Sequence, residues 1–185
     1  DDSYHGVVYS RDFGKSAYIT KARVQLMRDL GACQSAMGAF FINQGLETLP
    51  MRIQKHSSNA KMVAEFLNSC DKVEMVSYPT LEGNPYRELA QKYLPNGCSG
   101  VIAFSVKGGR EAGIRFINSL KMISLLVHVA DIRSCVLHPA SSTHRQLSDE
   151  QLVAAGITPG LIRLSVGTEH IDDILDDLKQ ALDQI

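Results

Sequence analysis

The chain has 185 residues, with 19 Lys and Arg against 20 Asp and Glu and a formal net charge of −1. Hydrophobic residues make up 44% of the sequence, the balance of an ordinary globular core. The charge balance gives no support for binding to nucleic acid or to an anionic membrane surface. No apolar stretch reaches the roughly 18 residues that a membrane span requires. We therefore expect one domain, or one domain with an appendage, in the cytoplasm.

Helical periodicity dominates the first 70 residues. The patterns predict three helices there, over 15–30, 35–49 and 51–69. In the third helix, His56 and Asn59 are expected to face solvent. The first 45 residues also carry apolar clusters, such as 40–42, that have few apolar partners nearby in the sequence. They indicate either a fragment that packs on a missing domain or an N-terminal arm.

From residue 73 onward, predicted strands and helices alternate. Strands are expected over 73–78, 101–106, 122–129, 135–137 and 161–166, and helices after 84–85, after 109, from 148 and over 171–182. Asn84 is expected to cap a helix that turns Tyr86, Leu89, Ala90 and Tyr93 inward. The run from Ser148 to Gln151 fits a capping box. The pattern predicts an α/β or α+β fold, a sheet covered by helices, with a boundary near residue 70.

The four cysteines, Cys33, Cys70, Cys98 and Cys135, are widely spaced and form no CxxC pair. A cysteine zinc site requires paired ligands, so none is expected. We expect four mostly buried free thiols in a reducing compartment.

Polar residues that could carry chemistry concentrate in the segment 124–167. A metal site there would use His128, Cys135, His138 and His144, but the last two do not share a helix face, and Asp131 is the one nearby carboxylate. The alternative is ordinary loop polarity with satisfied buried groups.

Two further interpretations have weak support from the sequence. Ser141 or Cys135 could act as a nucleophile with a histidine, but neither stands in a GxSxG frame. The run 107–110 could bind phosphate where a helix begins, but an ordinary strand-to-helix turn explains the same residues.

Arg163 is the most informative single residue. Its neighbours in 161–166 are mainly apolar, which indicates a buried strand. An arginine there cannot lose its charge and must find a partner. The partner is either an internal carboxylate, Asp131 or Glu169, or the carboxylate of a ligand, which the planar guanidinium matches with two hydrogen bonds.

Several motifs resemble the Cys/Met-metabolism enzymes, the trans-sulfuration family of pyridoxal-phosphate enzymes of fold type I. The motifs are 138–144 (HPASSTH), 161–167 (LIRLSVG) and 171–174 (IDDI). Within the family, the chain is most similar to the O-acetylhomoserine sulfhydrylase (homocysteine synthase) branch. The matching segments are 3–6 (SYHG), 21–26 (KARVQL), 28–31 (RDLG), 44–49 (QGLETL) and 95–109.

The resemblance implies a fold and a division of the chain. It implies an α/β small domain, C-terminal in the intact enzyme, with a small and mostly antiparallel sheet covered by helices. Residues 1–50 would be the end of the large pyridoxal-phosphate-binding domain, 51–70 a linking helix and 71–185 the small domain.

The resemblance also implies site residues. Arg163 falls on the family's arginine for the substrate α-carboxylate, and Thr143 on a threonine near the substrate. His128 falls where relatives carry Ser or Asn beside that carboxylate. It either hydrogen-bonds the substrate or supports the backbone around Val129. We expect no catalytic, cofactor-binding or metal-binding residue in this chain, because none of its nine lysines stands in the Schiff-base motif.

The implied activity belongs to the intact enzyme. Sulfide or a thiol would replace the acetate of O-acetylhomoserine to give homocysteine, in methionine biosynthesis, with pyridoxal phosphate as cofactor and a homo-oligomer as the working form. The chain alone is expected to be inactive and to bind no cofactor. The alternatives are a cystathionine γ-synthase, a γ-lyase or a methionine γ-lyase fragment, and a non-catalytic scaffold.

Overall fold

A computed structural model describes residues 4–185, so Ser3 of the 3–6 motif lies outside the described residues. The chain divides into two compact units, Asp1–Glu47 and Thr48–Ile185. Among residues 4–185, no helix is both long enough and apolar enough to cross a lipid bilayer.

The first unit is made of short helical segments. They are α1 (Tyr9–Asp12), η2 (Gly14–Ser16), α2 (Ala17–Lys21), η3 (Ala22–Met27), α3 (Arg28–Leu30) and α4 (Ala36–Glu47). The helix expected over 15–30 is therefore present as a helical run, but its middle part, η3, is π-helical. The run ends at Gly31, whose φ of 69° is the left-handed conformation that commonly closes a helix.

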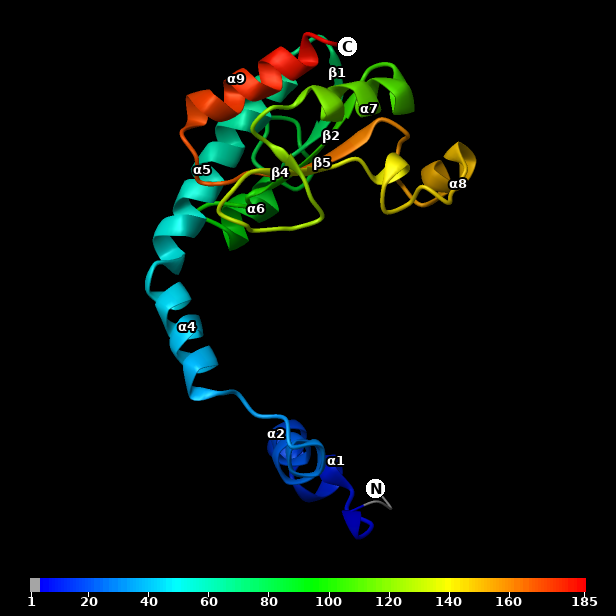
Figure 1. Ribbon diagram of the computed structural model, residues 1–185. Coiled ribbons are helices and arrows are strands. Elements are labelled where there is room, and N and C mark those ends of the chain that lie inside the picture. Colours follow the sequence, from blue (N-terminus) through cyan, green and yellow to red (C-terminus); the bar gives the residue numbers. More distant parts are fainter. Residues whose placement is uncertain (1–3) are drawn as a thin grey trace. The chain divides into compact units, whose positions relative to one another are not determined.

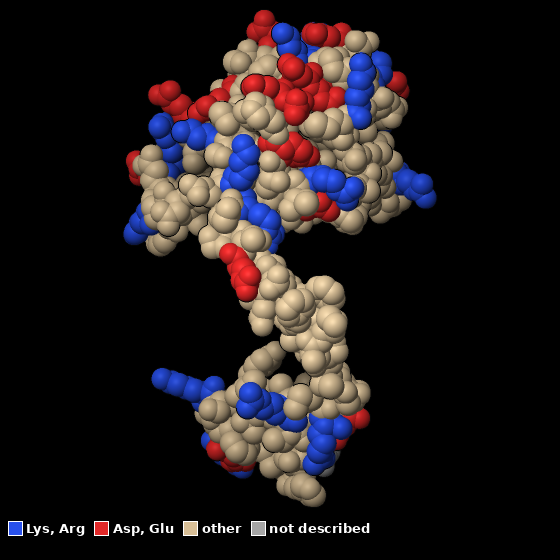
Figure 2. Space-filling model, turned by 60° about the vertical axis from the view of Figure 1, so that its left-hand side comes forward, with Lys and Arg blue, Asp and Glu red and all other residues tan. Residues whose placement is uncertain are grey.

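Helix α4 buries none of its side chains within this chain. Its large apolar residues, Met37, Phe40, Phe41, Ile42 and Leu46, are each more than half exposed. No charged residue stands between Asp29 and Glu47, and the corresponding stretch in Figure 2 is uncharged. An apolar surface of this kind is typical of a segment that packs against another part of a protein.

The second unit is built on a five-stranded sheet. Its strands are β1 (Val73–Ser77), β2 (Val101–Val106), β3 (Ser124–Leu125), β4 (Cys135–Leu137) and β5 (Leu161–Ser165), in the order β1-β2-β5-β4-β3. All neighbours are antiparallel except β3 and β4, which are parallel. The mostly antiparallel sheet is thus confirmed, whereas the strand expected over 122–129 is reduced to two residues.

Three helices cover one face of this sheet: α5 (Leu49–Asn68), α7 (Gly109–Ser119) and α9 (Ile171–Leu182) (Figure 1). Alternate residues of the central strands, such as Phe104 in β2 and Leu164 in β5, point into the core between sheet and helices. Phe104 meets Phe116 of α7 edge to face, with ring centroids 5.7 Å apart. We call the opposite side of the sheet its open face.

The expectation that His56 and Asn59 face solvent is wrong, because both are buried in α5. His56 Nδ1 lies 2.7 Å from the carbonyl oxygen of Val166, and Asn59 Nδ2 donates to the carbonyl oxygens of Gly167 and Glu169. The chain that leaves β5 runs along α5, so its backbone carbonyls need donors from that helix. Polarity alone does not distinguish such donors from solvent-facing residues.

Helix α6 (Arg87–Tyr93) also differs from expectation. Of its expected inward residues only Ala90 is buried, while Tyr86, Leu89 and Tyr93 are exposed. The residue that caps α6 is Tyr86, and Asn84 Oδ1 instead accepts a hydrogen bond from the Tyr86 N–H at 3.0 Å. The main core cluster contains no described residue of α6, so the helix has no large apolar surface to cover.

Helix α8 (Asp149–Ala154) confirms the expected capping box. Ser148 Oγ accepts from the backbone N–H of Gln151, and the Gln151 side chain accepts from the Ser148 N–H. The cysteines are free, but the expectation that most are buried is wrong: Cys33 is exposed, Cys70 and Cys98 are half-buried and Cys135 alone is buried.

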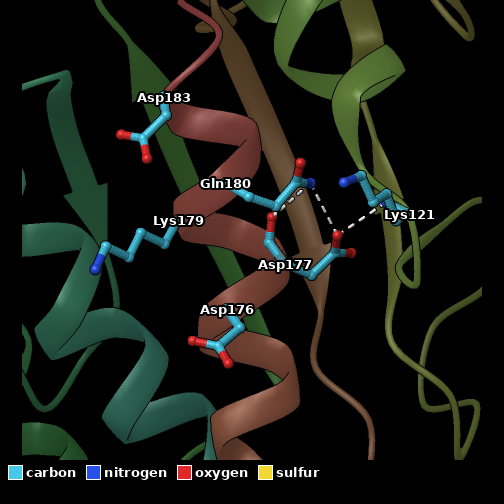
Figure 3. A pocket seen from close by; sticks show the side chains of 6 residues that line it. All are labelled: Lys121, Asp176, Asp177, Lys179, Gln180 and Asp183. Atoms are coloured by element: carbon cyan, nitrogen blue, oxygen red, sulfur yellow. Dashed lines mark hydrogen bonds between the residues drawn. The ribbon is translucent and has the colours of Figure 1, made fainter.

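Helix α9 also holds the chain ahead of β3. The carboxylate of Asp177 accepts backbone N–H groups from Lys121 (2.8 Å), Met122 (3.0 Å) and Ile123 (2.8 Å). Gln180, one turn later, donates to the same carboxylate (Figure 3). These contacts fix the entry to β3 although only two residues form that strand.

Candidate functional site

The open face of the sheet carries Arg163 near its middle. In the register of the sheet, Arg163 of β5 lies between Ala103 of β2 and Leu137 of β4. Its neighbours in sequence, Ile162 and Leu164, point into the core, so the alternation of the strand turns Arg163 to the open face. The small side chain of Ala103 leaves room beside the guanidinium.

Among residues 4–185, the guanidinium of Arg163 makes one hydrogen bond. Its Nη2 donates to the carbonyl oxygen of Val127 at 2.7 Å, and its buried Nε has no hydrogen-bond partner. Neither candidate internal carboxylate pairs with it. Glu169 accepts from the N–H and the hydroxyl of Ser134, and Asp131 pairs with Arg133 and His128.

The loop 126–134 explains why Val127 reaches Arg163. The loop joins β3 to β4, which are parallel neighbours, so it must return across one face of the sheet. The helices occupy the core face, and the loop therefore crosses the open face and reaches β5. We call it the crossing loop. It contacts β5 at two points: Arg163 meets the Val127 carbonyl, and Ser165 Oγ accepts the N–H of Ala130 at 3.1 Å.

His128 lies in the crossing loop, next to the carbonyl that Arg163 holds. Its side chain is 59% exposed, with Nδ1 3.7 Å from Asp131 Oδ2. Asp131 accepts from the backbone N–H of Arg133 at 3.0 Å and from its guanidinium at 3.4 Å. These hydrogen bonds hold the pKa of Asp131 below its ordinary value, so it stays an anion beside His128.

The HPASSTH motif is organised around His138, which is fully buried. Its Nε2 lies 2.9 Å from the carbonyl oxygen of Pro159, which can only accept, so Nε2 carries the proton and Nδ1 accepts from Ser141 Oγ at 2.8 Å. Burial lowers the pKa of His138. The ring also lies against Gly113 of α7, where an added Cβ would come within 2.6 Å of Nε2.

Thr143 follows η4 (Pro139–Ser141) and is exposed. Its Oγ1 lies 2.9 Å from Nδ1 of His144. Within the described residues, no hydrogen bond links Thr143 to Arg163 or to the crossing loop. Of the three residues expected to bind substrate, the structure therefore brings Arg163 and His128 together through the crossing loop, and leaves Thr143 on a separate segment.

The surface of the second unit has hollows that could admit a small ligand. One, of about 220 Å³, lies beside the crossing loop and is lined by Ile53, His56, Ser57, Cys98, Ser99, Gly100, Val101, Val129, Ala130 and Ser165. The other, of about 520 Å³, is lined by α9 residues and Lys121 (Figure 3). Among residues 4–185, no three His, Cys, Asp or Glu side chains are grouped to hold a metal ion.

Among residues 4–185, Arg163 on the open face has no carboxylate partner, and a guanidinium in that state can bind one anionic group. The comparisons with known proteins show the family of the chain. The chain belongs to the Cys/Met metabolism PLP-dependent enzyme family, which it matches over residues 1–183. It is 47% identical to the O-acetyl-L-homoserine sulfhydrylase of Leptospira meyeri and covers 44% of that protein. It is 45% identical to the homocysteine synthase of Schizosaccharomyces pombe and covers 42% of it.

A solved structure agrees with this assignment. A putative O-acetylhomoserine (thiol)-lyase from Campylobacter jejuni superposes with a TM-score of 0.85 at 43% identity. The match covers 99% of this chain and 43% of that one. That crystal structure is described with N'-pyridoxyl-lysine-5'-monophosphate at its position 205. The chain thus spans less than half the length of these relatives.

The described residues do not fit the family's cofactor by themselves. Pyridoxal phosphate needs a lysine for its aldehyde, donors for its phosphate and an acid for its ring nitrogen. A hollow of about 360 Å³ in the first unit contains a lysine, and it is lined by Tyr9, Ser10, Ala17, Tyr18, Lys21, Ala22 and Leu26. That lining offers neither an acid nor an arginine, so we assign the cofactor no residue here.

Sequence reasoning missed three participants in the site. Ser165 carries a detectable signal, because it stands two residues after Arg163 on the same strand and so shares its face. The Val127 carbonyl and the Ala130 N–H have no such signal in the sequence. Every residue has these backbone groups, and their place here depends on the path of the loop between the parallel strands β3 and β4.

Proposed function

We propose that this chain is the C-terminal part of an O-acetylhomoserine sulfhydrylase, and that its open sheet face binds the amino-acid end of the substrate. The overall reaction replaces the acetate of O-acetylhomoserine by sulfide or a thiol, giving homocysteine and acetate. Pyridoxal phosphate supplies the electron sink for this chemistry when it is bound in the intact enzyme.

The observation that carries the proposal is the state of Arg163. Its guanidinium has five N–H donors, and the part of the chain that the structure describes satisfies one of them, with a neutral carbonyl. Its Nε is buried without an acceptor among residues 4–185, and a buried charged donor left unsatisfied is costly unless an acceptor arrives. A carboxylate is the acceptor that the planar group matches best.

In this proposal the chain contributes binding and orientation. Arg163 would hold the α-carboxylate at two oxygen atoms and so fix the direction of the Cα–H bond. His128, beside Arg163, would face the same end of the substrate, and Thr143 would approach from the HPASSTH segment. Residues of the intact, homo-oligomeric enzyme that lie outside this chain would hold the cofactor, so residues 1–185 alone are expected to form no homocysteine.

The proposal is tested by Arg163→Lys in the full-length enzyme. Lysine keeps the charge but holds the carboxylate at one point, and loss of a charged hydrogen bond costs roughly 1.5–3 kcal/mol, about ten- to a hundred-fold in kcat/KM for O-acetylhomoserine. The melting temperature and the visible cofactor absorbance should be unchanged.

A matched control is Arg115→Lys, an exposed arginine on α7 at the helix-covered side of the sheet. It should leave kcat/KM unaltered. If Arg163→Lys stays within about twofold of the parent enzyme, a change of only ~0.4 kcal/mol, then Arg163 does not bind the carboxylate.

A further inference from the structure

Ser165 joins the crossing loop to the strand that carries Arg163. It stands two residues after Arg163 on β5, on the same face, and is 1% exposed. Its Oγ accepts the N–H of Ala130, while Arg163 donates to the Val127 carbonyl. Arg163 thus holds the crossing loop at Val127 and Ser165 holds it at Ala130. These two loop residues flank His128 and Val129.

The loop end held by Ser165 has an unusual backbone. Ala130 has a φ of 62°, a left-handed conformation that residues other than glycine rarely adopt; among residues 4–185, His5 is the only other non-glycine residue with a positive φ. Such a conformation persists where its surroundings hold it, and it is concentrated at functional sites. The Ser165 hydroxyl oxygen is the side-chain group that accepts a hydrogen bond from the Ala130 N–H.

We propose that Ser165 is a positioning residue for substrate binding. It fixes Ala130, and through it the crossing loop, so that the Val127 carbonyl orients the guanidinium of Arg163. The inference rests on the proposed function, in which Arg163 binds the substrate carboxylate. Ser165 would then contribute to the affinity of the enzyme for its substrate as well as to the stability of the fold.

Ser105 provides a matched control for a purely structural hydroxyl. It is also buried, on the same face of the neighbouring strand β2, and its Oγ lies 2.7 Å from Thr158 Oγ1. It makes no hydrogen bond to the crossing loop. Ser105→Ala therefore removes a buried hydroxyl from the same sheet without releasing Ala130.

The test measures steady-state kinetics and thermal melting of the full-length holoenzyme. Ser165→Ala should raise KM for O-acetylhomoserine about three- to ten-fold with kcat within about twofold, because a looser crossing loop weakens substrate binding while Arg163 remains to orient the substrate once it is bound. Ser105→Ala should leave KM unchanged. Ser165→Thr keeps the acceptor oxygen and should restore KM, since the 220 Å³ hollow beside Ser165 has room for a methyl group.

Hydrogen exchange gives a second readout that does not depend on turnover. Peptides covering 126–134 should exchange faster in Ser165→Ala and at the parent rate in Ser105→Ala. If the alanine variant folds poorly, Ser165→Cys replaces it, because sulfur is a weaker acceptor of similar size and should give a smaller rise in KM.

The double variant separates this inference from the proposed function. If Ser165 acts through Arg163, Ser165→Ala should raise KM less in the Arg163→Lys background than in the parent. An unaltered KM in Ser165→Ala, or a rise equal to that of Ser105→Ala, overturns the positioning role even where Arg163→Lys is strongly impaired. If Arg163→Lys leaves kcat/KM for O-acetylhomoserine at the parent value, the proposed function itself is overturned.

Discussion

At the scale of single residues, buried polar groups decide how the candidate site is held. His138 is an example, since its ring joins the HPASSTH segment to the carbonyl of Pro159, just ahead of β5. Gly113 makes room for that ring on α7. A glycine inside a helix costs roughly 1 kcal/mol relative to alanine, and here a close contact requires it.

The buried ring predicts a pH-dependent stability. Burial lowers the pKa of His138 from 6.5, so the unfolded chain binds this proton at a higher pH than the folded chain does. The stabilising effect of His138 is therefore complete above about pH 6.5 and is lost as the pH falls toward the folded-state pKa. The gap in unfolding free energy between the parent and His138→Gln, roughly 1–3 kcal/mol at pH 7.5, should narrow at pH 5.5.

Urea unfolding of both proteins at the two pH values measures this gap. Groups common to both proteins cancel in the difference. An equal gap at pH 7.5 and pH 5.5 would show that His138 does not titrate differently in the folded and unfolded chains.

At the scale of secondary-structure elements, α9 both covers the core and anchors the segment 121–123. Three backbone N–H groups of that segment depend on one carboxylate, that of Asp177. Asp176, the preceding residue, lines the same hollow but is exposed and makes none of these bonds (Figure 3).

This difference predicts unequal effects of two neighbouring substitutions. Asp177→Ala should lower the free energy of unfolding by about 3 kcal/mol, because it leaves three donors without their charged acceptor. Asp176→Ala should change it by less than about 0.5 kcal/mol. Thermal or urea unfolding of the two variants decides the matter, and similar losses would contradict the anchoring role of Asp177.

The same elements show how far sequence reasoning reaches. Strand β5 was predictable from its apolar run, and so was the need of Arg163 for a partner, because an arginine in a buried strand cannot lose its charge. The partner of Arg163 was not, since its contact with Val127 joins residues 36 positions apart through a loop whose path depends on the whole sheet. His56 and Asn59 were misread because donors to a buried backbone look like solvent-facing residues in a sequence.

At the scale of the whole molecule, the two units differ in how completely they cover their apolar side chains. Every residue of the main core cluster lies between Ala60 and Ile185, in the second unit. In the first unit α4 buries nothing. Surfaces of this kind rarely remain uncovered in solution.

We therefore expect residues 1–185 to self-associate, and residues 48–185 to do so less while keeping a cooperative thermal transition. Sedimentation velocity at two protein concentrations measures the first property, and circular dichroism the second. If both proteins sediment as monomers at both concentrations, the exposed apolar surface of α4 needs no partner. A non-cooperative melt of 48–185 would show that the second unit depends on the first.

The crossing loop also has a consequence for the order in which the protein is made. The crossing loop is held by Ser165, which binds Ala130, and by Glu169, which binds Ser134, while Asp177 binds the segment 121–123 ahead of β3. All three anchors come later in the chain than everything they hold. On a ribosome the loop therefore emerges before these anchors, and it cannot bind Ser165 and Glu169 until 35 further residues have been made. The crossing loop would therefore reach its native form only after residues 165–169 have been made, so a chain stalled or truncated before them would lack that form.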